Sequence, residues 1–160
     1  MSEYRTGLGW DSHRLAAGRP LILGGVAIPS ELGLEGHSDA DVLAHAITDA
    51  ILGAAALGDI GMHFPDSDPR WKGADSLQFL AHARDLATAH GFEVVSVDST
   101  IIIERPKLSD YRHAIREKLA ATLALGIERV SVKFKTAEKF GAVGQGLAAE
   151  AEAVATLRLS

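Results

Sequence analysis

The chain has 160 residues, of which 47% are hydrophobic and 23% are charged, and its formal net charge is -5. This length and composition are typical of one globular domain with a single core. A nucleic-acid partner is not expected, because phosphate binding needs a basic surface that this acidic chain lacks. The sequence contains no cysteine, which excludes disulfides and thiolate chemistry, so a metal site would use His, Asp and Glu.

The chain shows no pattern for export or for membrane insertion. Its first ten residues, MSEYRTGLGW, lack the charged and apolar segments of a signal peptide. The most apolar stretch, 42–60, is interrupted by His45, Thr48, Asp49 and Asp59, and no run reaches the roughly 18 apolar residues of a membrane helix. We therefore expect a cytoplasmic protein with no membrane partner, and the small size favours an oligomer.

The N-terminal part of the chain predicts a strand followed by a hairpin. Residues 4–9 are expected to form a short strand that leads into a loop. Residues 21–23 and 26–28 flank Gly24-Gly25, which is a two-residue hairpin signal.

A capped amphipathic helix is the clearest predicted element. Ser38 and Asp41 have the spacing of a capping box with Ser38 as the N-cap, and the helix is expected to run to about Leu57. With successive residues about 100° apart, apolar side chains fill one half of this helix. His45 lies on the polar half, with Asp41 and Asp49 four residues to either side.

The rest of the chain alternates loops, helices and strands. Residues 59–69 hold two prolines and several turn formers and predict a long loop, which is often functional in a compact domain. Helices are expected from Asp75 to Gly91 and from Ser109 to Gly126, strands at 94–103, 130–134 and 151–159, and a glycine-rich loop at 140–146. The predicted fold class is therefore α/β (α+β), a single domain over 1–160 with a mixed β-sheet packed on helices.

Three residues have the chemistry of a zinc site. Asp11 and His13 are two residues apart, so in extended chain both side chains point to the same side. His45, on the polar half of the helix, can reach the same point in a compact fold, and the three would leave a fourth zinc position open. Asp41 or Asp49 would orient the His45 ring. The alternative stays open, because an Asp-x-His pair also occurs by chance and a helix histidine is often only solvated.

The expected start of that helix is a candidate anion site. Free backbone N–H groups and the helix dipole attract anions there. His37 and Ser38 would add a ring nitrogen and a hydroxyl that suit phosphate oxygens. The alternative is that Ser38 is only a helix cap.

Two further segments carry polar groups suited to a phosphorylated ligand. The segment 133–139, KFKTAEK, offers three cations, a hydroxyl and a carboxylate at the end of a predicted strand. Glu138 suits a Mg²⁺ ion that bridges phosphates, although a charged strand end is also often only solvated. In the long loop, Asp59, Asp66 and Asp68 either bind sugar hydroxyls or only form turns.

An ordered set of motifs resembles the signature of the 2-C-methyl-D-erythritol 2,4-cyclodiphosphate synthase family. The central run is 37–42, HSDADV, followed by His45, Asp49 and 53–61, GAAALGDIG. The other matching segments are Asp11-Ser12-His13, 24–29 (GGVAIP), 64–69 (FPDSDP), 72–76 (KGADS), Pro106-Lys107 and 136–139 (TAEK). They span essentially the whole chain in order and without a large insertion, which makes the resemblance specific.

The resemblance implies a homotrimer with active sites between neighbouring subunits. It implies conversion of 4-diphosphocytidyl-2-C-methyl-D-erythritol 2-phosphate to the 2,4-cyclodiphosphate with release of CMP, a step of the non-mevalonate isoprenoid route. The substrate would therefore be a CDP-linked small molecule. Because the transfer is intramolecular, no protein nucleophile is required.

The resemblance also implies roles for individual residues. By position, Asp11, His13 and His45 take the zinc-ligand role and Glu138 the Mg²⁺ or Mn²⁺ role. His37 and Thr136 match the transition-state-stabilising residues of the family. The implied substrate contacts are Asp11, Ser12, His13, His37, Ser38, Asp59, Ile60, Gly61, Phe64, Pro65, Asp66, Ser67, Asp68, Ile103, Glu104, Arg105, Pro106, Lys107, Leu108, Ser109, Lys135, Thr136, Ala137, Glu138, Ala142 and Gln145.

Three positions depart from the family pattern. Ala142 and Gln145 stand where many relatives carry Phe and Arg near the central channel of the trimer, so a channel ligand would be held differently here. Lys135 replaces a small hydroxyl residue and adds positive charge beside the diphosphate.

Two other functions fit the same residues. A metal-dependent phosphohydrolase of a nucleotide-sugar-like substrate would use the same ions to activate water. Outside enzymes, the alternative is a trimeric scaffold with a structural zinc, although structural zinc usually has four protein ligands and only three are identified here.

Overall fold

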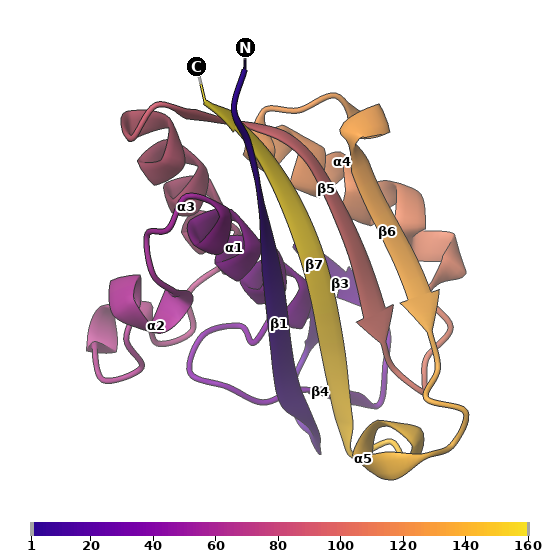
Figure 1. Cartoon of the computed structure of the whole chain (residues 1–160). Helices are drawn as coiled ribbons and strands as arrows, with labels where there is room; N and C mark the ends of the chain where they lie inside the picture. Colours follow the sequence, from indigo (N-terminus) through magenta and orange to yellow (C-terminus); the bar gives the residue numbers. More distant parts are fainter. Residues whose placement is uncertain (1, 160) are drawn as a thin grey trace.

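One five-stranded sheet and three longer helices make up most of the fold in the computed structural model, which describes residues 2–159 (Figure 1). The strands are β1 Tyr4–Ala17, β2 Leu21–Leu23, β3 Val26–Ile28, β4 Leu32–Leu34, β5 Phe92–Ile102, β6 Val130–Lys135 and β7 Ala148–Leu159. The helices are α1 Val42–Ala54, α2 Ile60–His63, α3 Leu77–Ala89, α4 Arg112–Leu123 and α5 Gly141–Gly144, with 3₁₀ turns η1 Pro69–Trp71, η2 Ser109–Tyr111 and η3 Ile127–Arg129.

The large sheet is mixed, as the sequence predicts. Its strand order is β4-β1-β7-β5-β6, and β2 pairs with β3 in a separate hairpin. All neighbours are antiparallel except β5 and β6, which are parallel and connected through α4. Helices α1, α3 and α4 lie behind the sheet in Figure 1, and its front face is bare. The buried apolar side chains form one core between the sheet and these helices.

Two glycines let α1 lie directly on β1. A Cβ at Gly9 would sit 1.8 Å from the carbonyl oxygen of Ala46, and one at Gly7 would sit 2.0 Å from that of Ala50. The inward face of β7 beside them carries four buried alanines, at 149, 151, 153 and 155. With these small residues, the helix backbone packs against the sheet backbone, and residues early in α1 come close to β1.

The first strand is longer than the sequence predicts. Residues 4–14 of β1 pair in register with β7, and residues 15–17 pair with β4. These partners come from distant parts of the chain, so the local pattern does not reveal how far the strand extends. Asp11 and His13 consequently lie within a strand, and the predicted loop after Gly9 is wrong.

The predicted start of the capped helix is also wrong. The N-cap of α1 is Asp41, whose carboxylate accepts the backbone N–H of Ala44 at 3.0 Å. Ala40 has a φ of 57°, so the chain is not helical before this point. The same carboxylate accepts the N–H groups of Gly24 and Gly25 at 2.9 and 2.7 Å. A buried protein carboxylate therefore occupies the helix start, so His37 and Ser38 lie before the helix, and their role as phosphate contacts stays a prediction.

The other predicted elements agree with the structure apart from their ends. The hairpin turns at Gly24 and Gly25, whose φ angles of 56° and 76° are positive as the two-glycine signal requires. Helix α1 ends at Ala54, three residues before the expected Leu57. The predicted loops at 59–69 and 140–146 contain the short elements α2, η1 and α5. No helix within residues 2–159 is long and apolar enough to span a membrane.

Candidate metal centre

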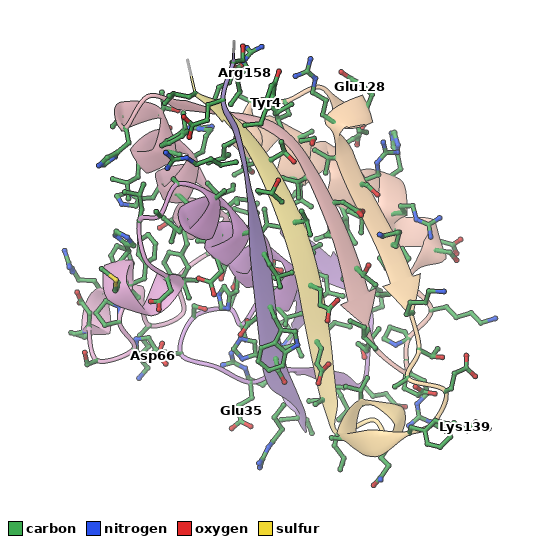
Figure 2. All side chains as sticks on the ribbon, in the orientation of Figure 1. Tyr4, Glu35, Asp66, Glu128, Lys139 and Arg158 are labelled. Atoms are coloured by element: carbon green, nitrogen blue, oxygen red, sulfur yellow. The ribbon has the colours of Figure 1, made fainter. Side chains whose placement is uncertain are left out.

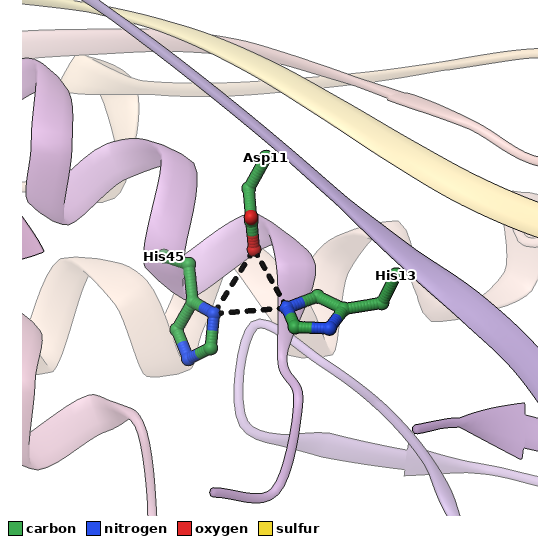
Figure 3. Close-up of side chains that lie close together, drawn as sticks. All are labelled: Asp11, His13 and His45. Atoms are coloured by element: carbon green, nitrogen blue, oxygen red, sulfur yellow. Dashed lines mark hydrogen bonds and ion pairs between the residues drawn. The ribbon is translucent and has the colours of Figure 1, made fainter. Parts of the chain in front are cut away.

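Asp11, His13 and His45 converge on one point (Figure 3). Asp11 and His13 project from the inner face of β1, and His45 projects from the first turn of α1. The Asp11 Oδ2 atom lies 2.9 Å from His13 Nε2 and 3.0 Å from His45 Nδ1, and the two ring nitrogens are 3.2 Å apart. The three donor atoms thus form a nearly equilateral triangle.

This triangle fits a tetrahedral metal ion. Donor atoms about 2.0 Å from a tetrahedral Zn²⁺ are about 3.3 Å from one another. The observed separations of 2.9 to 3.2 Å are close to this value. One carboxylate oxygen and two imidazole nitrogens are also a chemically ordinary ligand set for zinc. The residues present therefore fit a zinc ion with one open position.

The ionisation of the triangle shows which protons a metal ion would have to displace. Burial by itself raises the pKa of Asp11, but hydrogen bonds with His13 and His45 outweigh it and lower that pKa to about 2. Burial lowers the pKa of His13, but the hydrogen bond and charge of Asp11 outweigh it and raise that pKa. The Nδ1 atom of His13 lies 2.9 Å from the carbonyl oxygen of Glu35, which only accepts, so Nε2 is left as the electron-pair donor. A metal ion that binds here would replace the proton that Asp11 favours on Nε2 and would meet the electron pair of that nitrogen.

The ring of His45 is not held by the residues that the sequence suggested. Asp41 binds backbone N–H groups, and Asp49 accepts the N–H of Ile60 at 2.8 Å. His45 Nε2 instead lies 2.7 Å from the hydroxyl of Ser76 and 3.2 Å from that of Ser38. Ser76 is 31 residues from His45 and lies at the N-cap of α3, and no local signal in the sequence marks this contact.

A hollow of about 490 Å³ opens beside the metal ligands. Its wall includes the three ligands together with Gly36, His37, Ser38, Ile60, Gly61, Phe64, Pro65, Asp66, Trp71 and Phe79. The rings of Phe64 and Phe79 stack with centroids 4.3 Å apart and give the hollow an apolar side. The sequence interpretation did not include Gly36, Trp71 or Phe79, because in sequence they have only the pattern of turn or core residues.

His37 lies in the wall of this hollow rather than at a helix start. Its Nε2 atom donates to the carbonyl oxygen of Asp68 at 3.1 Å, which ties the ring to the loop that carries Phe64 to Asp68. The Asp68 carboxylate pairs with Arg70, and the carboxylate of Asp59 caps α2 through the N–H of Met62. Ser67 is exposed on the same loop. Asp59 and Asp68 therefore form turns, and the other reading of the sequence, that they bind sugar hydroxyls, stays a prediction.

Most of the implied contact residues between 103 and 136 line a second hollow of about 260 Å³. Its wall is Ile103, Glu104, Pro106, Lys107, Leu108, Ser109, Arg112, Phe134, Lys135 and Thr136. The Glu104 carboxylate accepts the backbone N–H groups of Ala137 at 3.0 Å and Lys139 at 3.1 Å. Between these two residues, Glu138 is exposed with a φ of 52°. Glu104 thus holds the shape of the loop that presents Thr136 and Glu138.

The two hollows are far apart within one chain. The first is beside β1 and the second is at the end of β6, and strands β7 and β5 lie between them. Three strand spacings correspond to about 14 Å. Figure 2 shows the same separation, with Asp66 and Lys139 on opposite sides of the molecule. The structure therefore does not bring Glu138 and Thr136 to the metal ligands of the same chain.

Ser12 and Ala142 share a third hollow. Ser12 points to the other side of β1 from Asp11 and His13, and it lines this space with Arg14, Ala142 and Leu147. Gln145 and Arg105 are both exposed, and neither of them lines the metal hollow.

Comparison with known proteins identifies the family. The model of the YgbB family matches residues 4–158. The chain belongs to the YgbB family. A relative from Solibacter usitatus (strain Ellin6076), named 2-C-methyl-D-erythritol 2,4-cyclodiphosphate synthase, is 75% identical over 157 residues, which cover 98% of this chain and 99% of that protein.

Solved structures of YgbB-like proteins have the same fold. A CDP-bound 2C-methyl-D-erythritol-2,4-cyclodiphosphate synthase has a TM-score of 0.89 at 43% identity, covering 96% of this chain and 99% of the other. The bifunctional IspDF of Campylobacter jejuni has a TM-score of 0.96 at 42% identity, covering all of this chain and 43% of the longer protein. The resemblance seen in the sequence motifs, and the fold class it implied, are therefore confirmed.

Proposed function

We propose that this chain, a single domain over 1–160, converts 4-diphosphocytidyl-2-C-methyl-D-erythritol 2-phosphate to 2-C-methyl-D-erythritol 2,4-cyclodiphosphate with release of CMP. This is a phosphorus–oxygen lyase reaction of the non-mevalonate isoprenoid route, carried out in the cytoplasm. The convergence of Asp11, His13 and His45 beside a hollow of substrate size is the observation that carries the proposal. The proposal is supported by the 75% identity, over almost the whole chain, to the Solibacter usitatus protein named 2-C-methyl-D-erythritol 2,4-cyclodiphosphate synthase.

The reaction is a displacement at phosphorus within one molecule. An oxygen of the substrate's 2-phosphate forms a bond to the β-phosphorus, and the bond from that phosphorus to the oxygen of CMP breaks. The electron pair of the broken bond leaves with CMP, so the atoms balance without water or a protein nucleophile. The protein has to fold a flexible polyanion for in-line attack and to offset its charge.

The three residues of the metal hollow, together with Glu138 beside the second hollow, suit this task. Asp11, His13 and His45 would hold Zn²⁺, and Glu138 would hold Mg²⁺ or Mn²⁺ together with the substrate. Bound metals supply charge neutralisation and polarise the phosphoryl oxygens.

Hydrogen-bonding and apolar groups would position the rest of the substrate. Doubly protonated His37, with Nε2 on the Asp68 carbonyl, would donate from Nδ1 to phosphate oxygens, and Thr136 would donate from its hydroxyl. The apolar wall at Phe64 would receive the methylerythritol part, and Asp59 and Gly61 the ribose. Residues 103–109 with Lys135 would receive the cytidine and its phosphates.

A second copy of the chain would complete each site, as a homotrimer. The two hollows are separated by two strands in one chain, so one substrate reaches both only if a neighbour supplies the second. The bare face of the sheet offers a surface for such a neighbour. Leu8 and Trp10 on this face are 71% and 54% exposed, and Val154 lies beside Leu8 in the register. Apolar side chains gathered on a bare sheet face are typical of an interface.

Replacing Leu8 with aspartate should convert the oligomer to monomers and abolish turnover. A charge on the apolar face would be buried without a partner in the assembled state. Light scattering coupled to gel filtration would measure the mass. Met62→Lys is the matched control, because Met62 is equally exposed but lies on α2 away from the sheet face, and its mass should stay that of the unmodified protein. A Leu8→Asp protein with unchanged mass would contradict the interface.

Glu138→Gln should leave the amount of bound zinc unchanged. It should raise the Mg²⁺ concentration needed for half-maximal rate by about tenfold or more, because an amide is a much weaker Mg²⁺ ligand than a carboxylate. Turnover measured over a Mg²⁺ series would show this, with Glu128→Gln as a control at an exposed glutamate on η3. An unchanged Mg²⁺ requirement would exclude this role of Glu138.

The products of the purified protein test the reaction itself. Incubation with the CDP-linked substrate and Mg²⁺ should yield a cyclic diphosphate and CMP in equal amounts, as read by ³¹P NMR. A metal-dependent phosphohydrolase would give inorganic phosphate or an acyclic product, and a scaffold would give none. Either of the latter results would reject the proposed function.

A further inference from the structure

A buried chain of hydrogen bonds leads away from the metal centre through Ser76 to Asp39. Ser76 is fully buried, and its hydroxyl lies 2.7 Å from His45 Nε2. The same hydroxyl makes a short hydrogen bond to Asp39 Oδ1. The other carboxylate oxygen of Asp39 accepts the backbone N–H of Ser76 at 3.1 Å, and Asp39 Oδ1 also accepts the N–H of Asp41 at 3.1 Å. Asp39 and Ser76 are thus fixed relative to each other through both backbone and side chain.

The direction of these hydrogen bonds follows from the groups involved. An ionised carboxylate only accepts, so the single hydroxyl proton of Ser76 points to Asp39. The Ser76 oxygen can then only accept from His45, which places a proton on Nε2. The Nδ1 atom of His45 lies 3.0 Å from the Asp11 carboxylate, so with Nε2 protonated the proton between Nδ1 and Asp11 is the one that a metal ion would displace. The Nδ1 electron pair would then face the metal ion together with Asp11 and His13.

A hydroxyl alone would not set this direction. Serine both donates and accepts, so without Asp39 it can donate to Nε2 and leave the proton on Nδ1, where it would oppose a metal ion. His13 needs no such partner, because the Glu35 carbonyl behind its ring only accepts. Ser38, at 3.2 Å from His45 Nε2, accepts the N–H of Ala40 and lies 3.4 Å from the Ser76 hydroxyl, and within residues 2–159 its hydroxyl bonds to no carboxylate.

We propose that Ser76 and Asp39 are positioning residues that fix His45 in the tautomer able to bind a divalent metal ion through Nδ1. This inference rests on the metal centre of the proposed function and adds two residues to it. Neither residue touches the metal or the substrate. Their effect passes through the ring of His45, so it appears as metal affinity rather than as substrate recognition.

The test is zinc affinity at constant pH, measured by competition with a colorimetric chelator on the purified protein. Ser76→Ala and Asp39→Asn should each weaken zinc binding by about 10- to 100-fold, the usual effect of losing a partner behind a ligating histidine. The double variant should bind zinc no more weakly than Ser76→Ala alone, because Asp39 acts through Ser76. Affinities within about threefold of the unmodified protein, or losses that add in the double variant, would overturn the proposal.

Ser99→Ala is the matched control. Ser99 is also a buried serine, and its hydroxyl donates to the Ser131 carbonyl at 2.9 Å, on the far side of the sheet from β1. It should lose stability as Ser76→Ala does but keep its zinc affinity. In zinc-loaded protein, ¹⁵N-correlated NMR should show a slowly exchanging His45 Nε2–H that Ser76→Ala lacks. If the unmodified protein binds no zinc, the metal centre of the proposed function is rejected together with this inference. If it binds zinc and the two variants bind it equally well, only this inference is rejected.

Discussion

Replacing His45 with alanine is expected to remove bound zinc and to lower turnover by about 10³-fold or more. The variant keeps only Asp11 and His13 as donors, and two protein ligands do not make a stable zinc site. A metal that polarises phosphoryl oxygens lowers the activation barrier by several kcal/mol, and each 1.4 kcal/mol corresponds to a tenfold change in rate. Elemental analysis would give zinc per chain, and ³¹P NMR would give the rate.

The matching control for this change is His90→Ala. His90 follows α3, is exposed, and its ring lies 2.9 Å from the Leu86 carbonyl, so zinc content and turnover should both be unchanged. Thermal melting of the metal-free proteins would confirm that His45→Ala is folded. A zinc-free His45→Ala protein with full turnover would rule out the role of His45 and with it the metal centre.

Gly9→Ala should lower the free energy of unfolding by about 3 kcal/mol or more. This is at or above the largest cost that an added core methyl group usually has. The added methyl carbon would lie 1.8 Å from the Ala46 oxygen and 2.8 Å from the Ala50 nitrogen. Both are backbone atoms of α1, so no side-chain rotation relieves the contact and the helix has to move. For a domain of this size, the melting temperature would fall by roughly 6 to 12 °C.

The same change should also weaken zinc binding. Gly9 is two residues before Asp11, and Ala46 follows His45, so moving α1 away from β1 separates the donors. Gly53→Ala is the control within the same helix, because its Cβ would meet only the Leu8 oxygen at 3.9 Å. Alanine is favoured over glycine in a helix by up to about 1 kcal/mol, so Gly53→Ala should melt at the same temperature or higher. A Gly9→Ala protein that melts like Gly53→Ala would contradict the packing argument.

Several parts of the fold could be predicted because they depend on local chemistry. The Gly24-Gly25 turn adopts positive φ angles, which few other residues tolerate, and the hairpin forms where the sequence predicts it. Helices α1, α3 and α4 were recognisable from their apolar periodicity. Their ends were less well predicted, since Asp41 rather than Ser38 caps α1, and the same Asp41 carboxylate also binds a hairpin 16 and 17 residues away.

For the site, the sequence by itself determined which kinds of metal-ligand atom are available and that Asp11 and His13 lie on the same side of their strand. Asp11 and His13 lie on one face because alternation along a strand fixes residues i and i+2, wherever the strand is placed. The absence of cysteine limited the candidate ligands to oxygen and imidazole donors. The motif order also identified the family.

Only the tertiary structure decided which distant groups meet. His45 is 34 residues from Asp11, and it reaches the carboxylate because Gly7 and Gly9 let α1 lie directly on β1. The sequence placed Asp41 and Asp49 behind its ring, whereas the packing of α3 puts Ser76 there and gives Asp39 a role through it. Strand order put two strands, β7 and β5, between Glu138 and the metal ligands of the same chain. These outcomes depend on contacts between segments far apart in the chain, and local propensity does not encode them.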